Sequence, residues 1–212
     1  MDLQLAGRRI LITGASSGIG LATATMLAHE GARLALCARD EERLRAAIAE
    51  IAEVADVVTA TCDVTDRASV DTFVGTAVDH FGGLDGVVCN AGRSLMRTLD
   101  ETTDEEIRDE FDLKIFGALN VVRAARKALA DSDAAAVVIV NAILSRQPER
   151  QLAVTAAARA GLLNLSRSLA ADLADDGIRV NSVLLGLIDT GQWQRRYVSS
   201  GTDVTFGAWS CL

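Results

Sequence analysis

The residues that carry the clearest chemistry form a glycine-rich turn near the N-terminus. Residues Arg8–Thr13 read as an apolar strand, and Gly14, Gly18 and Gly20 follow it at the start of a helix. Glycine tolerates positive φ, and without a side chain it lets a diphosphate approach the backbone. The free N–H groups and partial positive charge at the helix N-terminus then face that diphosphate. Placed between a strand and a helix, this turn predicts a site for a phosphorylated dinucleotide.

The elements that would position the turn alternate between strands and helices. Strands are expected at residues 8–13, 33–37, 57–62, 84–89, 135–141 and 178–184. Helices are expected at residues 18–30, 40–53, 66–81, 103–130 and 151–175. The first helix is expected to pack through Ile19, Ala22, Met26 and Leu27. Because the strands are uninterrupted apolar runs, they indicate a parallel sheet covered on both faces. The prediction is a single α/β domain over residues 1–190, with a doubly wound, Rossmann-like parallel sheet in three layers.

Composition narrows the class of protein. The chain has 212 residues, half of them hydrophobic, which is enough to bury a full core in one domain. Its formal net charge of −8 argues against nucleic acid or an anionic membrane surface as partners. The longest apolar run, Ala134–Val140, is far shorter than a membrane span, and no signal segment is indicated. A cytoplasmic protein is expected.

Candidate metal ligands are few. The histidines lie on expected helices and the cysteines lack CxxC spacing: His29, His80, Cys37, Cys62, Cys89 and Cys211. No metal site is predicted.

Four motifs occur in an order that is typical of one enzyme family. They are Thr13-Gly14-Ala15-Ser16-Ser17-Gly18-Ile19-Gly20, Cys62-Asp63-Val64-Thr65, Cys89-Asn90-Ala91-Gly92 and Gly177-Ile178-Arg179-Val180-Asn181-Ser182-Val183. From residue 9 to about residue 190, the chain resembles the short-chain dehydrogenase/reductase family. The resemblance implies hydride transfer between a nicotinamide cofactor and a small carbonyl or alcohol substrate. A methyltransferase on a similar sheet is disfavoured by Asn90-Ala91-Gly92 and by the spacing of Gly14 and Gly18.

The resemblance also implies which residues line the cofactor site: Gly14, Ser16, Ser17, Gly18, Ile19, Gly20, Arg39, Asp63, Val64, Asn90, Ala91, Gly92, Arg159, Ile188 and Thr190. Relatives that bind NAD place an acid after the second strand, where it binds the ribose 2′-hydroxyl. Here Ala38 takes that place and Arg39 follows, and a guanidinium suits a 2′-phosphate. NADP is therefore expected in preference to NAD. The alternative is that Arg39 lies on a solvated loop, paired with Asp40 or Glu42.

The catalytic positions of the family carry different residues in this chain. The tyrosine that moves the proton falls on Thr155 and the lysine four residues later falls on Arg159. The serine falls near Leu144, beside Ser145, and the asparagine of the long helix falls on Lys114. An aliphatic hydroxyl is a far weaker acid than a phenol, whose pKa is about 10. An arginine does not exchange protons in a useful pH range, although it binds ribose hydroxyls. The sequence therefore predicts an atypical active site that lacks the family's usual acid.

Lys114 is the candidate replacement for that acid. Burial beside Arg159 would lower its pKa through desolvation and like-charge repulsion, and a lysine that titrates near neutrality can act as a general acid. Two alternatives stay open. In one, Lys114 and Arg159 together bind a carboxylate or phosphate of the substrate. In the other, Lys114 extends to solvent with its stem packed. Ser145 either polarises a carbonyl or caps a backbone group.

The altered positions leave a second class of function open, a non-catalytic NADP-binding protein that acts as a sensor or as the partner of an active subunit. Residues 191–212 are expected to form a substrate lid, truncated relative to the family. Tyr197 in this lid either swings inward toward the substrate or serves as a hydrophobic cover. The resemblance further implies a homodimer formed through the helices at residues 103–130 and 151–175.

Overall fold

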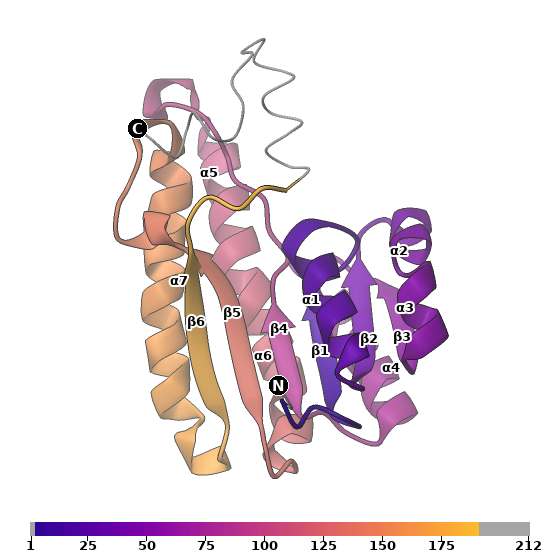
Figure 1. Ribbon diagram of the computed structural model, residues 1–212. Helices are drawn as coiled ribbons and strands as arrows, with labels where there is room; N and C mark the ends of the chain where they lie inside the picture. The colour runs from indigo at the N-terminus through magenta and orange to yellow at the C-terminus, as the bar shows by residue number, and fades with distance from the viewer. Residues whose placement is uncertain (1–2, 191–212) are drawn as a thin grey trace.

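Six parallel strands form one sheet in the order β3-β2-β1-β4-β5-β6 (Figure 1). The structure is a computed structural model that describes residues 3–190. The strands are β1 (Arg9–Thr13), β2 (Arg33–Ala38), β3 (Val57–Thr61), β4 (Gly86–Cys89), β5 (Ala136–Ala142) and β6 (Arg179–Leu185). The strand order reverses between β1 and β4, which places a crevice at the carboxyl ends of these two strands. The predicted doubly wound parallel sheet is confirmed.

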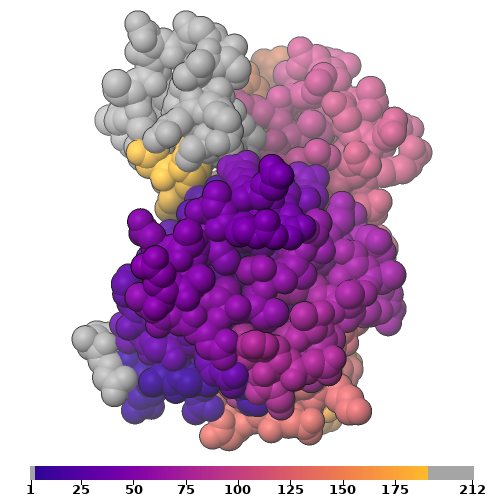
Figure 2. All heavy atoms as spheres, turned by 90° about the vertical axis from the view of Figure 1, so that its right-hand side faces the viewer, coloured from indigo at the N-terminus to yellow at the C-terminus, as the bar shows by residue number. Residues whose placement is uncertain are grey.

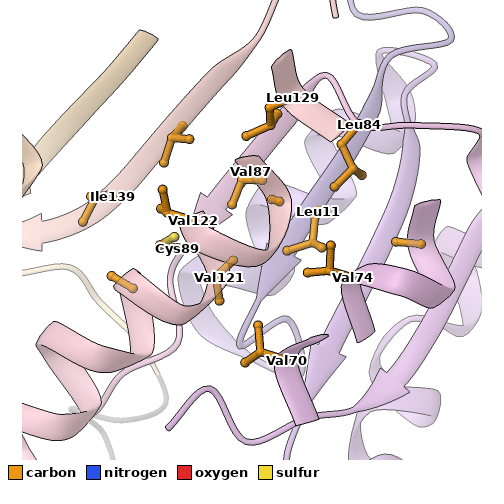
Figure 3. Packing of buried hydrophobic residues seen from close by; sticks show 14 of the residues in the cluster. Leu11, Val70, Val74, Leu84, Val87, Cys89, Val121, Val122, Leu129 and Ile139 are labelled. Carbon is orange, nitrogen blue, oxygen red and sulfur yellow. The ribbon is translucent and has the colours of Figure 1, made fainter. Parts of the chain in front are cut away.

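Helices cover both faces of the sheet, as the prediction of three layers requires. They are α1 (Gly18–His29), α2 (Glu41–Ala47), α3 (Ala49–Val54), α4 (Arg67–Phe81), α5 (Asp104–Phe111), α6 (Gly117–Ala130) and α7 (Ala153–Asp172). One core cluster joins the sheet to α4, α6 and α7, and a second joins it to α1, α2 and α3. Figure 3 shows Leu11 of β1 and Val87 of β4 lying among Val74 of α4 and Val121 of α6. Seen from the β3 edge, α2, α3 and α4 form one continuous surface (Figure 2).

Two expected helices are interrupted. Asp40 caps the second one by accepting from the Arg43 amide at 3.0 Å, but this helix breaks at Ile48 into α2 and α3. The helix expected at residues 103–130 contains a π-helical turn over Asp112–Phe116, between α5 and α6. Such turns hold one extra residue and are often found at functional sites. The helix expected at residues 151–175 is shorter in the structure, where it corresponds to α7 and is flanked by short 3-10 turns at Arg150–Leu152 and Ala174–Asp176.

The buried face of α1 matches the expected one only in part. Leu27 packs against the core as expected, but Ala22 is exposed and Met26 is 68% exposed. The fully buried residues of the helix are Gly20, Ala24 and Ala28. These small residues bring α1 close to β1, where a longer apolar face would hold it away.

Helix α4 offers a stabilising substitution. Gly75 lies inside α4, and a Cβ built on it meets no atom within 4 Å. Because alanine loses less backbone entropy in a helix, Gly75→Ala is expected to raise the free energy of unfolding by about 0.5–1 kcal/mol. Thermal denaturation followed by circular dichroism measures the change. Gly31→Ala is the control of opposite sign, since Gly31 has φ +79° and the Cα of Ala6 lies 3.3 Å from the added Cβ. A lower Tm for Gly75→Ala would contradict the prediction.

Candidate active site

A cleft of about 860 Å³ opens at the carboxyl ends of the strands. Its wall is built from the loops that follow β1, β2, β3, β4 and β5, from the π-helical turn and from the segment after β6. Of the residues expected to bind the cofactor, all but Gly20 lie on this wall: Gly14, Ser16, Ser17, Gly18, Ile19, Arg39, Asp63, Val64, Asn90, Ala91, Gly92, Arg159, Ile188 and Thr190. Segments far apart in the sequence therefore meet at one site.

The glycine turn adopts a backbone that other residues rarely accept. Gly14 has φ +69° and Gly18 has φ +56°. Helix α1 begins at Gly18 and has no acidic residue in its first turn, so its free N–H groups and positive end can bind an anion. Gly20 lies beneath the turn, where an added Cβ would come within 2.3 Å of the Gly14 carbonyl oxygen. Gly20 thus permits the close approach of α1 to the turn.

Thr13 and Asn90 join the glycine turn to the loop after β4. The Asn90 side-chain amide donates to the carbonyl oxygens of Thr13 at 3.0 Å and Gly14 at 3.1 Å. In return, the hydroxyl oxygen of Thr13 accepts from the backbone N–H groups of Asn90 and Ala91, both at 3.1 Å. These four hydrogen bonds fix two loops as one floor of the cleft.

Two arginines lie at the β2 end of the cleft. Arg39 follows β2 and Arg43 belongs to α2, and both are on the wall. Within residues 3–190, Arg39 forms no ion pair with Asp40 or Glu42, the arrangement considered as an alternative. Asp63 also lies on the wall, and its pKa is lowered. Burial alone would raise this pKa. The amide and hydroxyl of Thr65, which donate hydrogen bonds to the carboxylate, and the charge of Arg39 outweigh burial.

The four positions considered for catalysis separate into two pairs. Lys114 and Arg159 lie on the wall of the cleft. Thr155 is fully buried behind the wall. The hydroxyl of Ser145 is also buried, with no hydrogen-bond partner among the described residues, and its neighbours Ile143 and Leu144 line the cleft instead.

Thr155 takes part in a buried polar network. Its hydroxyl donates to Glu110 Oε1 at 2.7 Å and accepts from the Leu95 amide at 2.9 Å. The ammonium of Lys114 lies 3.4 Å from the same Glu110 oxygen and donates to the backbone carbonyl of Arg93. Glu110 is only 1% exposed and Lys114 only 4%. The alternative in which Lys114 extends to solvent is therefore wrong.

Burial lowers the pKa of Lys114 to about 8, while the Glu110 carboxylate raises it and the charges of Arg159 and Arg93 lower it further. The sequence predicts the effects of desolvation and of Arg159 on this pKa, but not the effect of Glu110. The available signal is an acid four residues before a lysine on one helix, the spacing at which two side chains meet.

Arg159 is a partly buried cation on the cleft wall. Burial lowers its pKa, which still leaves a guanidinium charged. One terminal N–H group donates to the Asn141 side-chain oxygen at 3.5 Å, and the Asn141 amide donates to the Arg159 carbonyl at 3.1 Å. The buried Nε has no hydrogen-bond partner within the described part of the chain.

The described residues contain no group of His, Cys, Asp and Glu side chains arranged to hold a metal ion. Between residues 3 and 190, no helix has both the length and the apolar character needed to cross a membrane. Tyr197, Cys211 and the rest of the expected lid over residues 191–212 lie outside the described residues.

The glycine turn, the sheet order and the cleft define a class of protein. The family model of the short chain dehydrogenases matches residues 8–199, and the chain belongs to this family. It is similar to a short chain oxidoreductase from Pseudomonas aeruginosa, described as NADPH-bound and as containing an atypical catalytic center. The two are 41% identical over 92% of this chain and 78% of that one, with a TM-score of 0.88.

Two further relatives are named enzymes. The L-sorbose reductase of Gluconobacter frateurii, solved with NADPH and L-sorbose, is 32% identical over 99% of this chain and 80% of that chain, with a TM-score of 0.92. The sorbitol dehydrogenase of Cereibacter sphaeroides is 31% identical over 99% of this chain and 79% of that protein. The family and fold predicted from the motifs are thus confirmed.

Proposed function

We propose that this chain is an oxidoreductase that transfers a hydride between NADP(H) and a small carbonyl or alcohol substrate, and that its active site lacks the family's usual residues. One observation carries the proposal. A single cleft combines a glycine turn at a helix N-terminus, two arginines at one end and a buried lysine of lowered pKa at the other.

The cleft fits a dinucleotide that carries an additional phosphate. The diphosphate has a cradle at Gly14 and Gly18, where the backbone has positive φ and where α1 presents free N–H groups. Arg39 and Arg43 offer guanidinium groups for a 2′-phosphate, and Arg159 places a third guanidinium on the cleft wall, where it can bind ribose hydroxyls. NADPH in the related structures supports this cofactor. When bound, it supplies or accepts the hydride.

The proton is assigned to Lys114. Thr155 is fully buried and its hydroxyl is already donated to Glu110, so it does not reach a substrate in the cleft. Lys114 lines the cleft, and with a pKa of about 8 it is mostly protonated at neutral pH. It therefore donates a proton to a carbonyl oxygen during reduction and accepts one from an alcohol above its pKa. Turnover in the direction of reduction should fall as the pH rises through this value.

The functional assignment is tested by label transfer. The protein is incubated with stereospecifically deuterated NADPH and a broad panel of carbonyl compounds, and NADPH binding is measured in parallel by fluorescence. We expect deuterium in an alcohol product from one face of the nicotinamide. Binding without transfer would instead identify a non-catalytic NADP-binding protein, such as a sensor or a partner subunit. Absence of both would reject the proposal.

Cofactor preference gives a sharper prediction for Arg39. NADPH should bind more tightly than NADH, and Arg39→Ala should weaken NADPH binding by about 10-fold to 100-fold, the usual effect of losing a hydrogen bond to a charged group. Binding of NADH should change little. Arg45→Ala is the matched control, since Arg45 is exposed on α2, pairs with Glu41 and does not line the cleft. Equal affinities for NADPH and NADH would remove Arg39 from the site.

We also propose that the chain forms a homodimer through α5, α6 and α7. Phe111 at the end of α5 and Phe116 just before α6 are 37% and 49% exposed, which supports a covered surface there.

A further inference from the structure

The carboxylate of Glu110 lies directly behind Lys114 without reaching the cleft. It comes from the last turns of α5, is 1% exposed and does not line the cleft wall. One oxygen accepts from Thr155 at 2.7 Å and lies 3.4 Å from the Lys114 ammonium. The other oxygen has no hydrogen-bond partner among residues 3–190. A buried carboxylate this poorly solvated depends on the charge beside it.

Thr155 fixes the position of this carboxylate. A hydroxyl has one proton, and the short contact with Glu110 takes it. The hydroxyl oxygen of Thr155 also accepts a hydrogen bond from the Leu95 amide, which ties the loop after β4 to α7. Lys114 holds that loop as well, through the carbonyl of Arg93. The hydroxyl, the carboxylate and the ammonium therefore form one network across three segments.

The π-helical turn directs Lys114 into this network. Lys114 is the central residue of Asp112–Phe116, and its side chain lies between Glu110 and the cleft. The charges that face it come from three elements: Glu110 from α5, Arg159 from α7 and Arg93 from the loop after β4. Two of these are positive. Within the described residues, Glu110 is the buried negative charge in contact with the ammonium.

We propose that Glu110, oriented by the hydroxyl of Thr155, is a positioning residue that holds the Lys114 ammonium at the cleft and keeps it protonated at neutral pH. The role of Glu110 in turnover rests on the proposed function. The electrostatic coupling between Glu110 and Lys114 is independent of that function. Thr155, which takes the place of the family's tyrosine, thus acts through Glu110 rather than on the substrate.

The sequence makes a direct measurement possible, because the chain contains two lysines, Lys114 and Lys127. Protein labelled with ¹³Cε-lysine gives one side-chain signal for each. Lys127 is exposed on α6 and serves as an internal reference, assigned with Lys127→Arg. The pKa of Lys114 is then read from an NMR titration that requires neither substrate nor turnover.

Glu110→Gln keeps the size of the side chain and removes its charge. We expect it to lower the pKa of Lys114 by about one to three pH units, the usual effect of losing an adjacent opposite charge. Glu105→Gln is the matched control, because Glu105 is an exposed acid on the same helix. Glu110→Asp retains the charge but withdraws it by one methylene, so a smaller change of the same sign is expected. This variant decides the question if the glutamine variant does not fold.

Kinetics give a second readout that a purely structural role would not move. In Glu110→Gln, the pH at which kcat falls should decrease by the same amount as the pKa of Lys114 measured by NMR. The affinity for NADPH should not change. An unchanged Lys114 titration in the glutamine variant, or in the aspartate variant if only that one folds, would overturn the proposal. Failure of label transfer with an altered titration would reject the proposed function and leave the charge coupling in place.

Discussion

Lys114→Met is expected to lower kcat by about 10²-fold to 10⁴-fold, the range that a positioned general acid contributes. The affinity for NADPH should stay within about twofold, because phosphate and ribose contacts come from other parts of the cleft. Steady-state kinetics with a carbonyl found by label transfer measure the first effect, and fluorescence titration measures the second. Lys127→Met makes the same chemical change on an exposed face of α6 and should leave both unchanged.

The substitution also has a cost in stability. Removing the ammonium leaves Glu110 buried beside Thr155 without a compensating charge, which typically costs about 3–5 kcal/mol. The double variant Glu110→Gln/Lys114→Met removes both charges, so it should recover stability but not turnover. A higher KM with unchanged kcat would show that Lys114 binds an anionic group of the substrate and does not transfer the proton.

Gly20→Ala is expected to lose NADPH binding and to lower the free energy of unfolding by about 1–3 kcal/mol or more. The added methyl group would lie 2.3 Å from the carbonyl oxygen of Gly14 and 2.4 Å from the side-chain amide of Asn90. Neither group can move away easily, because the Asn90 side-chain amide is hydrogen-bonded to the carbonyls of Thr13 and Gly14. Thermal denaturation and NADPH titration measure the two effects.

Gly186→Ala is the control for this substitution. Gly186 also lines the cleft, but a Cβ there meets nothing within 4 Å. Stability should be almost unaffected. If Gly20→Ala behaved in the same way, the close packing of α1 against the turn would have no energetic role.

The parts of the molecule that the sequence predicts well are those specified by neighbouring residues. The turn from Gly14 to Gly20 and the apolar strands are local patterns, so the sheet and the side of the cleft that holds the glycine turn follow from them. The break at Ile48 does not follow from the sequence, because residues 40–53 contain no glycine or proline to mark it. The buried face of α1 is predicted only in part: Leu27 packs against the core, but the fully buried residues are Gly20, Ala24 and Ala28, which hydropathy does not mark.

The side of the cleft near Lys114 depends on contacts between distant residues. Thr155 and Arg159 are four apart on α7, which predicts a shared face, yet only Arg159 reaches the cleft. Thr155 is instead enclosed by Glu110 and Leu95, which are 45 and 60 residues away in the sequence. Spacing along one helix cannot reveal such partners. The π-helical turn has the same origin, since Asp112–Phe116 reads as ordinary helix.

That turn also makes the site sensitive to chain length. A π-helical turn accommodates one residue more than an α-helix does, and each residue advances an α-helix by about 100°. Deleting Leu113 or Ile115 would replace the turn by a regular helix from α5 into α6, and would change the direction in which residue 114 points. The ammonium of Lys114 would then lose its position between Glu110 and the cleft, although every functional side chain was still encoded. A variant of this kind would retain all the functional residues in a sequence comparison and yet be inactive.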